Sequence, residues 1–137
     1  MEYKIRRVDY FYVAVKDEPG AAYQLLQQMA GLGVNLLAFA AVPTGPNTTQ
    51  LTLFPEDTHS LESVAKKSGM TLIGPHGAFL VQGSDELGAL VEVHKKLYDA
   101  DVNIFSSYGV TDGKCCYGYV IYVRPEEYGK ATGALGV

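Results

Sequence analysis

The chain opens with two successive hydrophobic patterns, the first typical of a strand and the second of a helix. Residues 2–16 alternate with a period of two, which predicts a strand. Residues 19–31 carry apolar side chains at helical spacing, which predicts a helix with one buried face. Pro19 suits its first turn, because the missing N–H would have no helical partner there. The apolar positions of this face are Ala22, Leu25, Leu26 and Met29.

The rest of the first half completes a recognisable order of elements. We expect a strand at 34–42, a turn at 43–47, a strand at 48–54, a helix from an N-cap at Thr58 to Gly69, and a short strand at 70–73. Strand, helix, strand, strand, helix, strand is the order of a ferredoxin-like unit. The pattern therefore predicts an α+β fold in which two helices cover one face of an antiparallel sheet.

The opening pattern returns later in the chain at a constant offset. Asp85-Glu86-Leu87-Gly88 follows Asp17-Glu18-Pro19-Gly20 by 68 residues, and Val102-Asn103 follows Val34-Asn35 by the same number. The offset also aligns Phe11 with Phe79, Val13 with Val81, Val42 with Val110 and Gly45 with Gly113. A register that holds this far predicts two copies of one structural unit, a βαββαβ repeat.

The second copy is expected to be shorter than the first. Its predicted elements are a strand at 77–82, a helix at 86–100, a strand at 102–110, a turn at 111–114, a strand at 115–123 and a helix from Pro125. The counterpart of the strand at 70–73 would lie beyond Val137, so this repeat is truncated at its last strand. We expect residues 2–7 to cover the open edge. The repeats are placed at 1–74 and 75–137.

Composition narrows the classes of partner. The chain has 137 residues, with 11 basic and 15 acidic side chains and a formal net charge of −4. The negative net charge and the lack of a run of basic residues argue against nucleic acid and anionic membranes as partners. No apolar run approaches the ~18 residues of a membrane span. The first residues lack the apolar segment of a signal peptide, so a cytoplasmic location is expected.

The residues with reactive side chains do not form a catalytic or metal-binding pattern. Cys115 and Cys116 are adjacent, and neighbouring side chains of a strand point to opposite faces. We expect two reduced thiols there, with a vicinal redox pair as the alternative. His94 takes the place of Leu26 and is expected to be a partly buried, hydrogen-bonded histidine, with a ligand contact as the alternative. The sequence contains neither zinc-type ligand spacing nor a nucleophile paired with a histidine base, so we expect no enzyme, cofactor or metal.

The repeated motif resembles the ACT domain, a family of small regulatory modules that bind amino acids. Asp17-Glu18-Pro19-Gly20 with Leu32-Gly33-Val34-Asn35-Leu36 is a close match, and the second copy, with Asp101-Val102-Asn103-Ile104, is a weaker one. The two copies cover nearly the whole chain, which is similar to a stand-alone tandem ACT protein. The resemblance implies a ligand site at a repeat or subunit interface, with an amino acid as the ligand and a second copy in a homodimer or a regulated protein as the partner. The residues that it implies are Asp17, Glu18, Pro19, Gly20, Asn35, Leu36, Asp85, Glu86, Leu87, Gly88, Asn103 and Ile104.

The chemistry of the repeated turn suits an amino acid. The amino terminus of a helix offers N–H groups and a partial positive charge to the carboxylate. Asp17 or Asp85 could hold the ammonium group, and Asn35 or Asn103 offers both a donor and an acceptor. Acidic residues and glycines at such a turn also serve the fold alone. The leading hypothesis is thus an amino-acid-sensing protein, and the alternative is a ligand-free oligomerisation or interaction scaffold.

Overall fold

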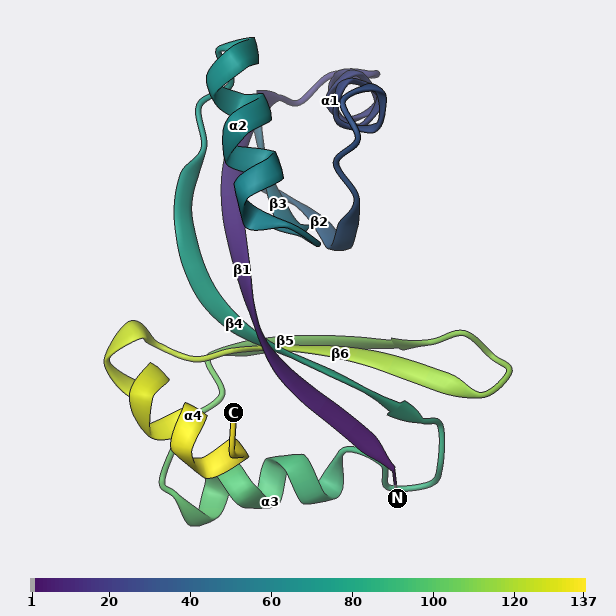
Figure 1. Ribbon diagram of the computed structural model, residues 1–137, viewed down its shortest axis with the longest axis vertical. Helices are drawn as coiled ribbons and strands as arrows, with labels where there is room; N and C mark the ends of the chain where they lie inside the picture. Colours follow the sequence, from purple (N-terminus) through teal and green to yellow (C-terminus); the bar gives the residue numbers. More distant parts are fainter. Residues whose placement is uncertain (1) are drawn as a thin grey trace. The chain divides into compact units, whose positions relative to one another are not determined.

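The protein, described here by a computed structural model over residues 2–137, divides into two compact units (Figure 1). The first unit is Asp9–His76, and the second is Gly77–Val137 together with the residues up to Val8. Strands β1 (Tyr3–Lys16) and β4 (Ile73–Ser84) contribute residues to both units. None of the helices within the described residues is long and apolar enough to cross a membrane.

The first unit has the expected two helices over an antiparallel sheet. Its strands follow the order β2 (Leu36–Gly45), β3 (Thr48–Pro55) and β1, and its helices are α1 (Ala21–Gly31) and α2 (Thr58–Ser68). The alternating apolar side chains of β1 and β3 lie next to each other on one face of the sheet, with Phe11 opposite Leu53 and Val13 opposite Leu51. These side chains form one buried cluster with Leu25 and Met29 of α1 and Leu61 and Val64 of α2.

The second unit repeats this plan. Its strands follow the order β1, β4, β6 (Cys116–Tyr122) and β5 (Ser106–Thr111), with α3 (Val91–Asp99), the 3-10 helix η1 (Pro125–Glu127) and α4 (Tyr128–Leu135). Phe79 lies opposite Ile121, and Val81 lies opposite Tyr119. All four belong to a core cluster that includes Val93 and Leu97 of α3 and Ala131 and Leu135 of α4. The α+β fold of two βαββαβ repeats is confirmed.

The amino-terminal segment covers the edge that the truncated second repeat leaves open. Residues from Tyr3 onward form the start of β1, and the Ser84 N–H donates to the Glu2 carbonyl at 3.1 Å. The approach is so close that a Cβ added at Gly83 would lie 2.5 Å from that carbonyl oxygen. The expectation that residues 2–7 pair with this edge is therefore confirmed.

Two predicted boundaries were wrong around the glycine at the start of β4. Residues 70–72 are not strand, and β4 runs without a break through Gly74-Pro75. Gly74 adopts a φ of 141°, and a Cβ there would lie 2.8 Å from the Tyr10 carbonyl oxygen. A glycine is needed because the neighbouring strand lies so close, which the local sequence does not reveal.

The helix starts also differ from the predictions. The N-cap of α2 is Asp57, which accepts the His59 N–H at 3.0 Å, whereas the Thr58 hydroxyl donates to Asp9 at 2.8 Å. Helix α3 begins at Val91 and not at 86, because Gly88 adopts a left-handed φ of 74° that ends any helix running through it. This later start leaves residues 85–90 outside the helix, with 85–88 exposed and 89–90 half-buried.

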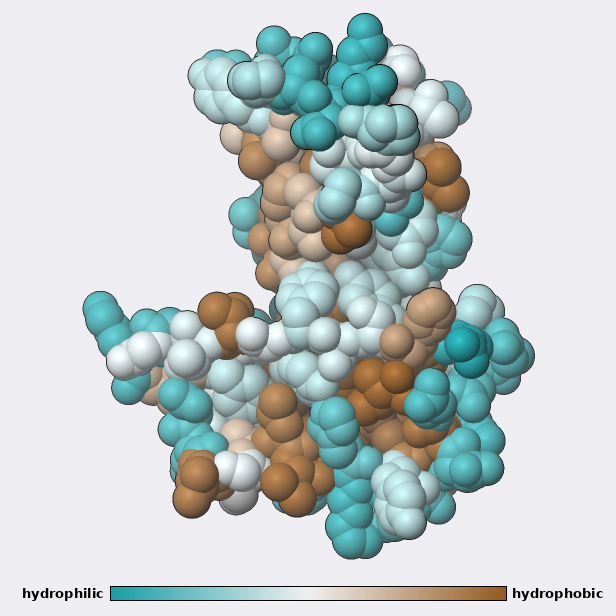
Figure 2. Space-filling view, turned by 180° about the vertical axis from the view of Figure 1, so that it is seen from behind, coloured by the Kyte–Doolittle hydropathy of each residue, from teal (hydrophilic) through white to brown (hydrophobic). Residues whose placement is uncertain are grey.

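Exposed apolar side chains lie on both units. On the face in Figure 2, hydrophobic side chains form separate patches bordered by polar ones. The second unit exposes Leu87, Val91, Tyr98, Phe105, Tyr108 and Val110. Two of these belong to β5, a strand at the end of the sheet order in which every residue is exposed. An exposed strand edge of this kind can pair with another chain.

Candidate functional site

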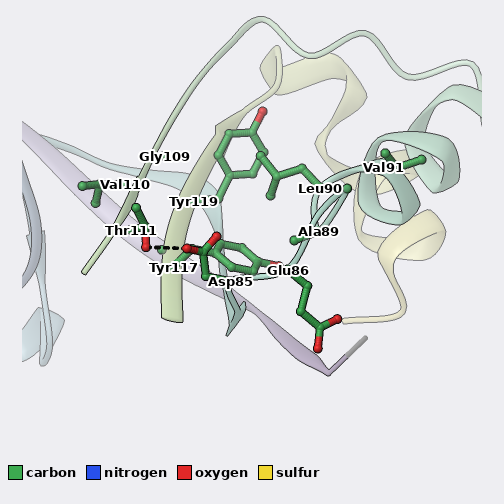
Figure 3. A pocket seen from close by; sticks show the side chains of 12 residues that line it. Asp85, Glu86, Ala89, Leu90, Val91, Gly109, Val110, Thr111, Tyr117 and Tyr119 are labelled. Atoms are coloured by element: carbon green, nitrogen blue, oxygen red, sulfur yellow. Dashed lines mark hydrogen bonds between the residues drawn. The ribbon is translucent and has the colours of Figure 1, made fainter. Parts of the chain in front are cut away.

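The second unit contains a pocket of about 470 Å³ at the turn before α3. Its walls come from the 85–91 segment, from residues 109–111 of β5 and from residues 117–119 of β6 (Figure 3). This volume lies within the usual range for small-molecule sites. The repeated turn of the second copy thus forms one wall, and a hairpin distant in sequence forms the other.

Asp85 is held against the hairpin by two hydrogen bonds. The Thr111 hydroxyl donates to its carboxylate at 2.9 Å (Figure 3). The Asp85 N–H donates to the Cys115 carbonyl at 2.8 Å. The carboxylate therefore has a fixed position although the residue is exposed. Its remaining lone pairs can accept hydrogen bonds from a bound cation.

The turn between Asp85 and α3 presents its backbone to the pocket. Gly88 lines the pocket in a left-handed conformation that a side chain would disfavour. The Ala89 N–H donates to the Glu86 carbonyl and the Val91 N–H to the Gly88 carbonyl, each at 3.0 Å. These bonds order the turn that leads into the helix and so place the positive end of the α3 dipole at the pocket.

A chain of three polar side chains crosses the pocket wall. The Tyr119 hydroxyl donates to Ser107 Oγ at 2.8 Å and lies 2.8 Å from His94 Nε2. Which of the two groups donates in the His94–Tyr119 bond depends on the ring nitrogen of His94 that carries the proton. His94 is hydrogen-bonded as expected, but it is exposed and not partly buried. Tyr119 itself is 6% exposed.

Sequence reasoning missed Tyr119 and Ser107, although the repeat register contains a signal for them. At the 68-residue offset, His94, Ser107 and Tyr119 align with Leu26, Phe39 and Leu51. Three apolar positions of the first copy are thus polar in the second, and the structure joins all three by hydrogen bonds. Comparing the copies position by position could have identified them.

Tyr117 contributes a polar atom that is not satisfied within the chain. Its hydroxyl oxygen is buried and has no hydrogen-bond partner among the described residues. Burial, followed by the proximity of Tyr3, raises the pKa of Tyr117, so the phenol stays protonated. Because this oxygen is buried, a group bound in the pocket does not reach it, and the hydroxyl is an exception to the rule that buried polar atoms have partners.

The charge of the pocket is negative. Among the described residues that line it, Asp85 and Glu86 carry carboxylates and none is a lysine, arginine or histidine. The other lining side chains are mainly apolar or aromatic. Such a lining favours a ligand with a cationic group and disfavours one with an additional anionic group.

The remaining predicted residues of the second copy lie outside this pocket. Leu87 is fully exposed. The Asn103 N–H donates to Glu127 Oε2 at 3.3 Å, and Ile104 packs against the core of the second unit. The structure therefore groups Asp85, Glu86 and Gly88 at the pocket, and places Leu87, Asn103 and Ile104 elsewhere.

In the first copy the predicted residues form the equivalent turn. Asp17, Glu18, Pro19 and Gly20 are exposed, Gly20 has a φ of 88°, and the Asp17 N–H donates to the Asn47 carbonyl at 2.9 Å. Asn47 and Cys115 are related by the 68-residue offset, so both turns use the same bond.

The other two predicted residues of the first copy have contacts that serve the fold. The Asn35 amide donates to Glu56 Oε2 at 2.5 Å, and the Glu56 N–H donates to the Asn35 carbonyl at 2.9 Å. This pair of bonds ties the segment before β2 to the end of β3. Leu36 is half-buried against the core of the first unit.

The two cysteines differ from the expectation. Cys115 and Cys116 form a disulfide at the exposed tip of the β5–β6 hairpin, so the expectation of two reduced thiols was wrong. They lie at the β6 end of the hairpin turn, where the chain departs from regular strand geometry, and Cys115 lies outside β6. The argument that neighbouring side chains point apart holds within a strand and fails at this turn.

Comparison with known proteins supports the fold. The chain is similar to protein BT0572 from Bacteroides thetaiotaomicron, with a TM-score of 0.78 and 15% identity over 96% of this chain and 88% of that one. It is also similar to the ligand-free regulatory subunit of aspartate kinase from Thermus thermophilus, with a TM-score of 0.61 and 16% identity over 99% and 96% of the two chains.

A further solved structure, of aspartokinase alpha and beta subunits, has a TM-score of 0.56 and 14% identity over 100% of this chain and 99% of that one. No protein-family model matches the sequence, and no curated protein matches it. At these identities the likeness establishes the fold. The chain therefore has the tandem ACT-type fold of aspartate kinase regulatory subunits, as its repeated motif predicted.

Proposed function

We propose that this chain is a non-catalytic regulatory protein that binds an amino acid in the pocket of its second unit. The observation that carries the proposal is the position of Asp85. Its fixed carboxylate lies at a pocket of suitable volume, next to the first turn of α3. An anionic side chain beside the positive end of a helix matches the opposite charges of a zwitterion.

In the proposed complex each charge of the ligand meets a complementary group. The Asp85 carboxylate binds the ammonium group, and the N–H groups of the turn around Gly88 bind the carboxylate. The ligand side chain lies against apolar groups such as Leu90 and Val110.

The pocket charge also sets an expected order of affinity. With two carboxylates and no cationic side chain in the described lining, a second ammonium or guanidinium group on the ligand is attracted. An additional carboxylate is repelled. We therefore expect basic amino acids to bind more tightly than neutral ones, and aspartate and glutamate to bind least.

The regulatory role rests on the likeness to regulatory subunits of aspartate kinase. A ligand regulates only if it binds two states of the protein with different affinities. We propose that the second state is read by a protein partner or by a second copy in a homodimer, in the cytoplasm. The exposed β5 strand supports the dimer. Two expectations from the sequence stay predictions. They are the repeat boundaries at 1–74 and 75–137 and the location of the site at a repeat or subunit interface.

Thermal or urea unfolding of the full chain with each of the twenty amino acids tests the proposal. A specific ligand at 100 times its dissociation constant should stabilise the chain by about 2.7 kcal/mol. No response across the panel would contradict amino-acid binding and favour the scaffold alternative.

A variant series locates the site. Asp85→Asn should weaken binding by roughly tenfold to a hundredfold, the contribution of a hydrogen bond to a charged group. Glu92→Gln removes the same charge in the first turn of α3 but outside the pocket lining, and should bind like the parent. Asp17→Asn reports whether the first-unit turn binds as well. Equal binding by the parent and Asp85→Asn would refute the assignment.

A further inference from the structure

The Cys115–Cys116 disulfide has no role in the proposed amino-acid site, yet it lies directly beside it. Both cysteines are exposed at the tip of the β5–β6 hairpin. The Cys115 carbonyl accepts the Asp85 N–H at 2.8 Å. The Thr111 hydroxyl shares its one proton between the Asp85 carboxylate at 2.9 Å and the Cys116 carbonyl at 3.1 Å. The peptide spanned by the disulfide thus contacts Asp85 directly through the Cys115 carbonyl, and the Cys116 carbonyl is linked to Asp85 through Thr111.

We infer that Cys115 and Cys116 form a reversible thiol–disulfide site for small-molecule thiols, and that its redox state controls how firmly the Asp85 turn is held. The disulfide is exposed, so an incoming thiolate can reach its sulfur atoms. Exchange with a soluble thiol is also the general route by which accessible disulfides open.

The exchange balances with a thiol as the two-electron reductant. A thiolate attacks one sulfur of the disulfide, breaks the Cys115–Cys116 bond and forms a mixed disulfide, and the expelled cysteine thiolate takes up a proton. A second thiol attacks the mixed disulfide and releases the other cysteine. The two cysteines gain two electrons and two protons, and the small molecule leaves as its own disulfide.

Opening the disulfide frees the backbone at the point where the turn is attached. A bond between neighbouring side chains closes a small ring that includes the Cys115–Cys116 peptide, so this peptide cannot adopt regular strand geometry. Once the ring opens, the side chains can move to opposite faces as in a strand. The Cys115 carbonyl then turns, and the Asp85 N–H loses its acceptor.

Asp112 holds the hairpin tip, including the Cys116 N–H of the peptide that turns, so the movement gives up this bond together with that of Asp85. The Asp112 carboxylate accepts the N–H groups of Lys114, Cys115 and Cys116 at 2.8, 3.0 and 3.2 Å. Ligand-type atoms of Asp112 and both cysteines lie within 4.8 Å of one another. Sulfur atoms in a disulfide are not thiolates, however, so this group is not a metal site in the structure described here.

The first unit provides an internal control. Its equivalent bond, from the Asp17 N–H to the Asn47 carbonyl, has nearly the same length of 2.9 Å. The residues that align with Cys115 and Cys116 are Asn47 and Thr48, which cannot form a disulfide. Reduction should therefore affect the Asp85 turn and leave the Asp17 turn unchanged.

Amide hydrogen exchange of the full chain, before and after treatment with dithiothreitol, tests the inference. The Asp85 amide should exchange roughly tenfold faster after reduction, as expected for the loss of one backbone hydrogen bond. The Asp17 amide should keep its rate. Oxidised glutathione should restore the slow rate at Asp85.

A double variant, Cys115→Ser with Cys116→Ser, should show the fast Asp85 rate with and without reductant. An Asp85 rate that reduction leaves unchanged would overturn the inference. So would alkylation of both thiols by a maleimide before any reductant is added, or failure of oxidised glutathione to restore the slow rate. None of these measurements uses an amino-acid ligand, so their outcome is independent of the proposed function.

Discussion

Replacing Gly83 by alanine tests how the second unit is completed at its open edge. A Cβ at this position would lie 2.5 Å from the Glu2 carbonyl oxygen, 2.8 Å from Tyr3 Cβ and 3.0 Å from Tyr3 Cα. Two of these three atoms belong to the backbone, so no side-chain rotation relieves the contact. The first residues of β1 must shift away from β4, and overpacking of this kind costs about 1–3 kcal/mol.

A smaller effect acts in the opposite direction. Alanine restricts the unfolded chain more than glycine does, which stabilises a compatible site by about 0.4–1 kcal/mol. We therefore expect the free energy of unfolding to fall by about 1–2 kcal/mol, the balance of the two effects. Because Ser84 donates to Glu2 and directly precedes Asp85, its amide should also lose protection.

Urea unfolding with a matched variant decides the question. Gly118→Ala makes the same chemical change in β6, where a Cβ would meet nothing within 4 Å. It should leave the stability unchanged or raise it by up to about 1 kcal/mol. If Gly83→Ala were as stable as Gly118→Ala, with normal protection of the Ser84 amide, the amino-terminal segment would not pack on β4 as described.

Two further predictions concern the pocket wall and the hairpin tip. Tyr119→Phe removes the hydroxyl that joins His94 and Ser107, and the loss of two hydrogen bonds should lower the free energy of unfolding by about 1–2 kcal/mol. A decrease below about 0.3 kcal/mol would mean that these bonds contribute nothing to stability. Hydrogen bonds from the N–H groups of Cys115, Lys114 and Cys116 lower the pKa of Asp112 below its ordinary 3.8. The ionised Asp112 therefore stabilises the fold above pH 3.8, and this stabilisation is lost as the pH falls through the lower pKa of the folded state. The Cys115 amide signal should titrate with that midpoint by NMR and should lose the transition in Asp112→Ala; a midpoint at or above 3.8 would contradict the hydrogen-bonded tip.

The sequence predicted the repeated fold because the strand and helix periodicities of each repeat are local features of the chain. Alternation in β1 and helical spacing in α1 follow from which side of each element is buried, and no distant contact is needed to read them. The register even relates individual bonds, since the Asp17 and Asp85 N–H groups both donate to the residue at the equivalent hairpin position. A duplicated sequence that keeps its buried positions keeps its backbone contacts as well.

The rest depended on contacts between residues that are distant in sequence. Position 74 in β4 is a glycine because the Tyr10 carbonyl of the neighbouring strand leaves no room for a side chain there. The pocket was only half predictable, since Asp85 belongs to the repeated motif whereas Thr111 and Tyr119 come from the hairpin on its other side. A motif identifies the residues of one segment, and the opposite wall is set by how the chain folds back onto it.

The two units therefore share a backbone frame and differ in what surrounds the turn. Thr111 aligns with Pro43, so Asp17 lacks the hydroxyl that fixes Asp85. The network of His94, Ser107 and Tyr119 likewise aligns with three apolar residues of the first copy. If the turn alone bound an amino acid, Asp17→Asn and Asp85→Asn would weaken binding equally. Because Thr111 holds the Asp85 carboxylate and proline stands at the equivalent position beside Asp17, the larger loss should follow the change at Asp85. An equal loss would show that the hairpin wall contributes nothing to the site.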